Sequence, residues 1–172
     1  MRQLHLLRHA KSSWDDDGDD HARPLNRRGR EAARAIGENL PKVVSGFDLV
    51  LCSSALRTRE TAELALSGFK PPPKIRYEDG LYLASREVLM QRLQEIDERY
   101  DAVIVIGHNP GLHELAMALA TPDSIGFSTL VNGKFPTGVR CRFVIGTGWA
   151  EINSTRHRLV DYVTVKSLGA DD

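Results

Sequence analysis

The chain has 172 residues, and its 23 lysines and arginines balance its 23 aspartates and glutamates to a formal net charge of zero. A hydrophobic fraction of 41% with 27% charged residues excludes a disordered chain, and zero net charge argues against a broadly basic nucleic-acid binder. No apolar run reaches the roughly 20 residues that cross a bilayer, and Cys52 and Cys141 are typical of buried, reduced thiols, so we expect one cytoplasmic domain over residues 1–172 with no nucleic-acid or membrane partner.

The first part of the chain predicts a strand, a loop and a helix. An apolar run over residues 3–7 indicates a mostly buried strand. A polar loop follows over residues 12–23, and a helix is expected over residues 26–40. Asn26 is the expected N-cap of this helix, and Pro41 is where we expect it to end.

The next segment repeats the pattern of a strand followed by a helix. Residues 48–52 predict a second strand, and Ser53 and Ser54 then supply capping side chains for a helix over residues 56–66. A short strand is expected over residues 75–78 after a run of three prolines.

The clearest strand in the sequence is the continuous apolar run over residues 102–106, which is typical of a strand covered on both faces. A helix over residues 85–98 precedes it, and a helix over residues 112–120 follows it. The side chains that the first of these helices is expected to bury are Val88, Leu89, Leu93 and Ile96.

After Thr121 the pattern changes to a glycine-containing loop and two late strands, over residues 139–145 and 159–165, which we expect to pair antiparallel at one edge. The earlier alternation of strands and helices predicts a mainly parallel sheet with helices on both faces. The predicted fold class is therefore α/β.

Polar side chains follow three of the predicted strands at the point where each strand ends. Arg8 and His9 follow the first strand, Arg57 lies just after the second, and His108 follows the strand over residues 102–106. Ligands of parallel sheets bind outside the carboxyl ends of the strands, so we expect these four side chains to share one crevice. Guanidinium and imidazole groups together predict an anion site, because guanidinium groups bind phosphate oxygens by paired hydrogen bonds and imidazole rings add donors.

Three motifs carry a resemblance to a known family: LLRHA at residues 6–10, SSALRTRET at 53–61 and GHNP at 107–110. Together they resemble the histidine phosphatase superfamily, which includes the cofactor-dependent phosphoglycerate mutases. Within it, the short chain and the motifs RPLN at 23–26 and FPTG at 135–138 are similar to the SixA-type phosphohistidine phosphatases. The resemblance implies the phosphoglycerate mutase-like fold, a three-layer α/β/α sandwich with a mainly parallel central sheet.

One position departs from the pattern of the superfamily. Ala10 follows His9 where the superfamily usually has glycine. Alanine adds a methyl group next to the implied nucleophile and excludes backbone conformations that glycine adopts easily. SixA-like chains tolerate alanine here, so the departure does not change the assignment.

The resemblance implies a role for each residue of the predicted anion site. His9 is the implied nucleophile, forming a phosphohistidine intermediate that water then hydrolyses. Arg8, Arg57 and His108 are implied to clamp the non-bridging phosphate oxygens. We expect no metal and no other cofactor, because fixed cations and donors take their place. Ser12, which follows the nucleophile closely, is a further candidate for phosphate binding.

The general acid is less well defined by the sequence. Larger relatives place a glutamate in an inserted segment, whereas the connection between Thr61 and Arg86 is short here. Glu78 is the candidate general acid, with Asp79 beside it, and the alternative for both is a solvated loop charge. Cleavage of a P–N bond to histidine needs less protonation of the leaving group than cleavage of a P–O bond, so a missing acid would suit phosphohistidine.

Five aspartates form an acidic loop, namely Asp15, Asp16, Asp17, Asp19 and Asp20. An EF-hand needs glycine at loop position six, and counting from Asp15 puts Gly18 fourth, so the calcium motif fails. We expect a solvated loop rather than a metal site, with Asp20 paired to Arg23 near the mouth of the crevice.

The function that these features predict is a metal-independent phosphatase that acts on phosphohistidine in a protein. Two alternatives stay open. One is a small-molecule phosphomonoesterase or mutase of the same superfamily, for which Glu78 would matter much more. The other is a non-catalytic module that binds phosphoproteins. The expected partner is accordingly a phosphorylated protein or a small phosphorylated substrate.

Overall fold

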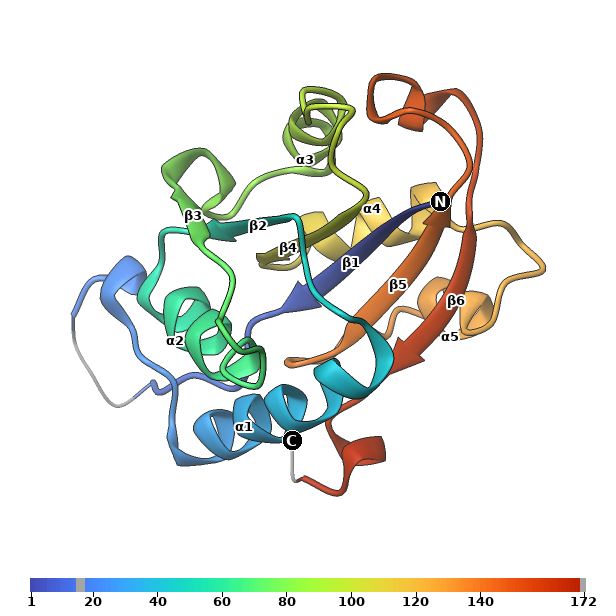
Figure 1. The fold of residues 1–172 in the computed structure, drawn as a ribbon. Helices are drawn as coiled ribbons and strands as arrows, with labels where there is room; N and C mark the ends of the chain where they lie inside the picture. Colours follow the sequence, from blue (N-terminus) through green and yellow to red (C-terminus); the bar gives the residue numbers. More distant parts are fainter. Residues whose placement is uncertain (15–17, 171–172) are drawn as a thin grey trace.

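The residues that the computed structural model describes, 1–14 and 18–170, form a six-stranded sheet in the order β3-β2-β4-β1-β5-β6 (Figure 1). Its strands are β1 (Arg2–Arg8), β2 (Leu49–Ser53), β3 (Ile75–Glu78), β4 (Ala102–Gly107), β5 (Arg140–Ile145) and β6 (Arg158–Val163). The pairs β1–β4, β2–β4 and β2–β3 are parallel, whereas β5 pairs antiparallel with both β1 and β6. The expected antiparallel edge is therefore confirmed.

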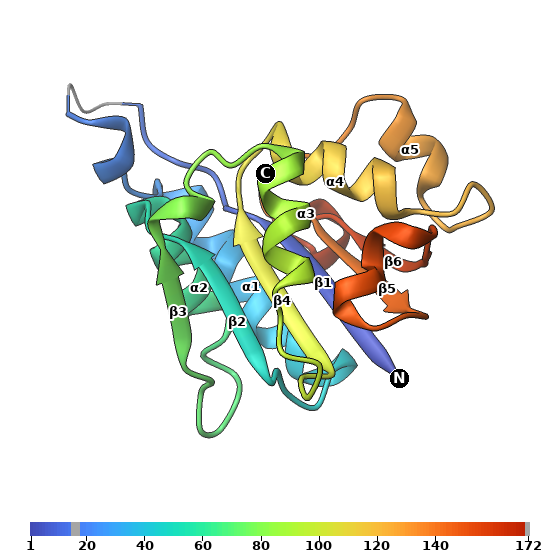
Figure 2. The ribbon, with the colours of Figure 1, turned by 90° about the horizontal axis from the view of Figure 1, so that it is seen from above.

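Helices cover the sheet on both sides. The α-helices are α1 (Arg27–Val43), α2 (Leu56–Ala65), α3 (Arg86–Gln94), α4 (Gly111–Leu119) and α5 (Phe127–Val131). Short 3-10 turns are η1 (Asp20–Ala22), η2 (Asp79–Leu81), η3 (Trp149–Ser154) and η4 (Lys166–Leu168). In Figures 1 and 2, α1 and α2 lie on one face of the sheet, and α3 and α4 lie on the other. The predicted three-layer α/β/α class is confirmed.

The side chains of β4 alternate between the two faces of the sheet, which explains why its sequence is continuously apolar. Val103 and Val105 pack into the core beneath α3 and α4, whereas Ile104 and Ile106 pack into the core beneath α1 and α2. Successive side chains of a strand point to opposite faces of the sheet, so a central strand between two helical layers needs apolar residues at every position. These two cores hold the strands whose ends carry the candidate site.

The beginning of α1 is tied to the segment that follows β1. The side chain of Asn26 accepts a hydrogen bond from the Gly29 backbone N–H at 2.8 Å, which confirms the predicted cap. Gly29 is needed for close approach, because a Cβ there would lie 1.9 Å from the carbonyl oxygen of Lys11. The Asn26 N–H also donates to that oxygen at 3.0 Å, so the helix start fixes the chain just beyond His9.

Some element boundaries differ from the predicted ones. Helix α1 continues through Pro41 to Val43, because a proline in the last turn removes only one helical hydrogen bond and the Val44 N–H still bonds to the Leu40 carbonyl. Helix α3 ends at Gln94 rather than at residue 98.

Two further differences concern helical segments on the α3/α4 side of the chain. Val88 is exposed rather than buried, since it lies one residue around the helix from the Leu89–Leu93 stripe that faces the core. The loop expected after Thr121 contains the short helix α5. Its N-cap is Gly126, whose backbone is in the left-handed conformation. Within residues 1–14 and 18–170, no helix has the length and apolarity to cross a bilayer.

Candidate active site

One cavity of about 460 Å³ collects the polar residues at the carboxyl ends of β1 and β4 and at the start of α2. Of the residues predicted to bind phosphate or to act in catalysis, it is lined by Arg8, His9, Ser12, Arg57 and His108. The rest of its lining comes from Lys11, Trp14, Asp20, Arg23, Leu83, Asn109 and Thr137. The expected convergence of strand ends therefore occurs.

His9 is held by both its backbone and its ring. Its N–H donates to the Gly107 carbonyl at 3.1 Å, and its Nδ1 lies 2.7 Å from the Ala10 carbonyl oxygen. A carbonyl oxygen only accepts, so this contact requires the proton on Nδ1 and leaves a lone pair on Nε2. The residue is 6% exposed, and burial lowers its pKa to about 3, with Arg8 and Arg57 acting in the same direction. At neutral pH the ring is therefore an uncharged imidazole with its lone pair on Nε2.

Ala10 fits its position without strain. Ala10 is fully buried, and its backbone N–H donates to Thr61 Oγ1 at 3.0 Å. Among the described residues other than glycine, a positive φ occurs at Leu83 and not at Ala10. Because the backbone here does not need the conformations reserved for glycine, alanine is accommodated beside His9.

The two predicted arginines both line the cavity, Arg57 as a buried residue and Arg8 as a half-buried one. Arg8 donates from Nη1 to the Phe135 carbonyl at 2.9 Å, and Arg57 donates from Nη1 to the Asp20 carbonyl at 2.8 Å. The Nε atoms of both arginines are buried without a hydrogen-bond partner among the described residues. Burial and the charge of Arg57 lower the pKa of Arg8, yet a guanidinium stays protonated at neutral pH. Both side chains therefore keep donors available for an anion.

His108 completes the group. Its ring centroid lies 5.3 Å from that of His9, and its Nε2 lies 2.7 Å from Ser53 Oγ. Burial lowers its pKa to about 3, so this ring is also neutral at pH 7. The expectation that Ser53 and Ser54 cap α2 is wrong, because the N-cap is Ala55. The two serine hydroxyls contact histidine rings instead, Ser54 bonding to His21 at 2.9 Å.

Asp20 is the site residue that sequence reasoning placed only at the edge of the crevice. It forms the expected ion pair with Arg23, at 3.2 Å, and also pairs with Arg57, at 3.1 Å. The Tyr82 hydroxyl donates to the same carboxylate. These contacts, the Tyr82 bond first, lower the pKa of Asp20 to about 2, so it is a carboxylate throughout the physiological range.

The structure places the two remaining candidates differently. Ser12 is buried in the cavity wall, and its hydroxyl contacts the Arg23 guanidinium. Glu78 does not line the cavity and instead binds Arg92 through both carboxylate oxygens, at 2.8 and 2.9 Å. It ends β3, three strands from β1, which corresponds to roughly 14 Å at the usual strand spacing. The expectation that Glu78 is the general acid is therefore not supported.

The acidic loop lies partly beyond what the structure describes. Asp15, Asp16 and Asp17 are outside the described residues, whereas Asp19 caps η1 and Asp20 belongs to it. Over residues 1–14 and 18–170, no group of three or more His, Cys, Asp or Glu side chains is arranged to hold a metal ion.

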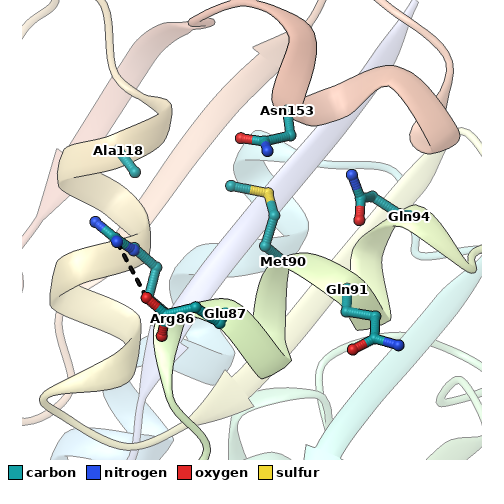
Figure 3. Close-up of a pocket in the computed structure, with 7 residues that line it drawn as sticks. All are labelled: Arg86, Glu87, Met90, Gln91, Gln94, Ala118 and Asn153. Carbon is teal, nitrogen blue, oxygen red and sulfur yellow. Dashed lines mark hydrogen bonds and ion pairs between the residues drawn. The ribbon is translucent and has the colours of Figure 1, made fainter.

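A second cavity, of about 430 Å³, lies between α3, α4 and η3 (Figure 3). Amide side chains and the thioether of Met90 line it, and Arg86 and Glu87 form an exposed ion pair at 3.0 Å along its rim. None of the described residues lining it is a histidine, and its arginine is already paired. Of these two cavities, the one at the strand ends therefore has the composition that suits an anion.

Buried histidines make the stability of the protein depend on pH. Burial lowers the pKa of His5, His9 and His108 to about 3 each, whereas histidines of the unfolded chain titrate near 6.5. Between these values the unfolded chain binds more protons, so each histidine raises the free energy of unfolding by up to about 1.4 kcal/mol per pH unit, a contribution fully present above pH 6.5. Urea denaturation should show a progressive loss of stability from pH 7 to pH 5, and a flat profile would contradict these buried neutral rings.

Comparison with known proteins agrees with this geometry. The family model described as histidine phosphatase superfamily (branch 1) matches residues 4–103. An uncharacterized protein of Mycobacterium tuberculosis (strain ATCC 25618 / H37Rv) is 35% identical over 162 residues, which cover 91% of this chain and 98% of the relative.

Two solved structures, both provisionally named phosphohistidine phosphatase SixA, resemble the whole chain. The one from Nakamurella multipartitia has a TM-score of 0.81 and 27% identity, covering 95% of each chain. The one from Agrobacterium tumefaciens has a TM-score of 0.78 and 28% identity, covering 95% of this chain and 97% of the other. With its matching family model and its cavity of three arginines and two neutral histidines, the chain belongs to the histidine phosphatase superfamily (branch 1) and is a phosphatase of the SixA type.

Proposed function

We propose that the protein removes the phosphoryl group from phosphohistidine on a protein substrate, with His9 as the nucleophile. The observation that carries the proposal is the state of the His9 ring. Its Nδ1–H is engaged with the Ala10 carbonyl at 2.7 Å, and the neutral ring keeps the Nε2 lone pair in a cavity lined by Arg8, Arg57 and His108. A fixed, uncharged nucleophile facing cationic donors is what in-line attack on a phosphoryl group requires.

The first step transfers the phosphoryl group from one imidazole to another. The His9 Nε2 lone pair forms a bond to phosphorus while the P–N bond to the substrate histidine breaks, and that electron pair returns to the substrate ring. His9 then carries the positive charge of an N-phosphorylated imidazolium, and its Nδ1–H remains on the Ala10 carbonyl. The bonds made and broken are of the same kind, so the step needs little driving force beyond positioning.

The second step returns the enzyme to its starting state. Water attacks phosphorus from the side vacated by the substrate ring, the P–N bond to His9 breaks, and phosphate and a proton are released. The guanidinium groups of Arg8 and Arg57, with the ring of His108, stabilise the charge on the equatorial oxygens in both steps. Fixed donors of this kind are effective because they need no reorganisation during the reaction, and two of them, Arg57 and His108, are buried.

Phosphohistidine and phosphate esters differ in what their leaving groups need from the site. An alkyl phosphate ester releases an oxygen anion that needs a proton, and general acid catalysis typically supplies 10²–10⁴-fold in rate, an order-of-magnitude range. Among the described lining residues, Asp20 is the only carboxyl group, and its low pKa of about 2 keeps it ionised. Glu78 is bound to Arg92 outside the cavity. The site therefore favours a leaving group that departs without a carboxylic acid.

The mouth of the cavity suits a side chain on a folded protein. Trp14 and Leu83 are both exposed apolar residues that line it. Trp14 stacks on Arg23, with the guanidinium carbon 3.7 Å from the ring centroid. An open rim of this composition can contact the surface around a phosphorylated histidine, whereas a small phosphate ester would use only the floor.

A comparison of substrates tests the proposal. We expect kcat/KM for a histidine-phosphorylated protein to exceed that for an alkyl phosphate monoester by at least about 10²-fold, the lower range of general acid catalysis. Activity should persist in EDTA. Higher activity on the alkyl ester would favour the small-molecule phosphatase, and binding of the phosphoprotein without turnover would favour the binding module.

A further inference from the structure

Asp20 occupies a distinct place in the cavity. Among the described lining residues it is the only carboxylate, set among the arginines Arg8, Arg23 and Arg57. Its side chain is 42% exposed, whereas that of Arg57, its direct partner, is 3% exposed. Asp20 therefore lies toward the mouth, and the guanidinium that it contacts lies toward the floor.

In-line attack fixes where the leaving group must go. The nucleophile His9 is 6% exposed and lies on the floor, so the group that departs opposite its Nε2 emerges toward the mouth. The part-exposed carboxylate of Asp20 borders this route. The Tyr82 hydroxyl, which donates to Asp20, comes from a ring stacked edge-on against His108 at 5.6 Å, so it ties the carboxylate to the floor residues.

We propose that Asp20 is the specificity-determining residue of the site, accepting a hydrogen bond from the protonated ring nitrogen of the phosphohistidine leaving group. The inference rests on the proposed function. The substrate ring carries phosphorus on one nitrogen and a proton on the other. As the P–N bond breaks, its electron pair returns to the ring, the proton stays on the ring, and the ring leaves as neutral imidazole. No proton passes to or from Asp20.

A permanent negative charge at this point discriminates between substrate classes. It stabilises the cationic ring of the phosphoramidate before and during bond breaking. It repels the negative charge that develops on the oxygen of a phosphate ester, and like charges at short range are unfavourable. Arg57 and Tyr82 both donate to Oδ2 of Asp20, and an arriving phosphate would compete for the guanidinium, which opens one acceptor position on that oxygen for the ring N–H.

Replacement of Asp20 by asparagine tests this role, because it keeps the size of the side chain and removes the charge. The ratio of kcat/KM for a histidine-phosphorylated protein to that for p-nitrophenyl phosphate should fall at least about tenfold in Asp20→Asn. The matched control is Asp19→Asn, which removes the same charge one residue away. Asp19 is exposed, does not line the cavity, and caps η1 through an oxygen that asparagine also has, so its ratio should equal that of the wild type.

Three results would overturn the proposal. An equal loss on both substrates means that Asp20 only positions Arg57. A larger loss on an alkyl phosphate than on phosphohistidine means that it acts as a proton donor. Values of kcat/KM that are unchanged from wild type on both substrates mean that it does not face the leaving group. Failure of the proposed function is a separate outcome, since it shows already in the wild-type protein as an absence of phosphohistidine hydrolysis.

Discussion

Replacement of His9 by alanine should lower kcat/KM at least about 10⁴-fold while the protein stays folded, because the variant lacks the atom that bonds to phosphorus. The structural cost is small. Among residues 1–14 and 18–170, the ring makes one hydrogen bond, to the neighbouring Ala10 carbonyl, and such a bond contributes about 1 kcal/mol. Steady-state kinetics and a thermal unfolding curve of the same preparation check both halves of the prediction.

A second buried histidine provides the control. His157 does not line the cavity, and its ring contacts the Ile152 carbonyl and the Gly146 N–H. His157→Ala should therefore lose stability and retain the activity of its folded fraction, which is the reverse of His9→Ala. A His9 variant that loses activity only in proportion to its loss of folded protein would show that the ring is structural.

Trapping of the intermediate gives a qualitative version of the same test. Wild-type protein mixed with radiolabelled phosphoprotein and quenched in base should carry a base-stable, acid-labile label, and His9→Ala should carry none. A label that persists in His9→Ala places the nucleophile elsewhere. Absence of label in wild-type protein during turnover argues for direct attack by water.

The sequence was sufficient to predict the floor of the site because of a general property of parallel sheets. Arg8 ends β1, His9 and His108 directly follow strands β1 and β4 at the same edge of the sheet, and Arg57 lies in the first turn of α2. The apolar runs predict where these strands end, and the common edge predicts that the side chains there lie close together, without any information on long-range contacts. The resemblance to a family then supplied their roles.

The parts that the sequence did not predict depend on strand order and on contacts between distant segments. Glu78 looks close to the site along the chain, but β3 is the edge strand, and Arg92 of α3 captures its carboxylate. In the sequence, Asp20 is one of several charges in a predicted solvated loop. Its place in the cavity depends on contacts with Arg57 and Tyr82, which are distant along the chain. Local sequence carries no signal for either arrangement.

Replacement of Arg57 by alanine should lower kcat/KM about 10³-fold, or about 4 kcal/mol of transition-state stabilisation. The side chain is buried at the cavity floor, where removal of one preorganised donor is most costly. Arg57→Lys should recover little, because an ammonium offers a point charge in place of the planar fork that bonds two phosphate oxygens. The quantity to compare across the three proteins is kcat/KM for p-nitrophenyl phosphate.

Arg59 is the matched control for this variant, since it lies on the same helix, carries the same charge and does not line the cavity. Its guanidinium stacks on Tyr77 at 4.2 Å and donates to the Ser54 carbonyl. If the effect of Arg57 were only a general positive potential, Arg59→Ala would share a large part of it. If Arg57 binds the phosphoryl group directly, kcat/KM of Arg59→Ala stays within about threefold of wild type. Arg57→Ala also removes one of the two cationic partners of Asp20, so the pKa of that carboxyl group should rise in this variant and not in Arg59→Ala.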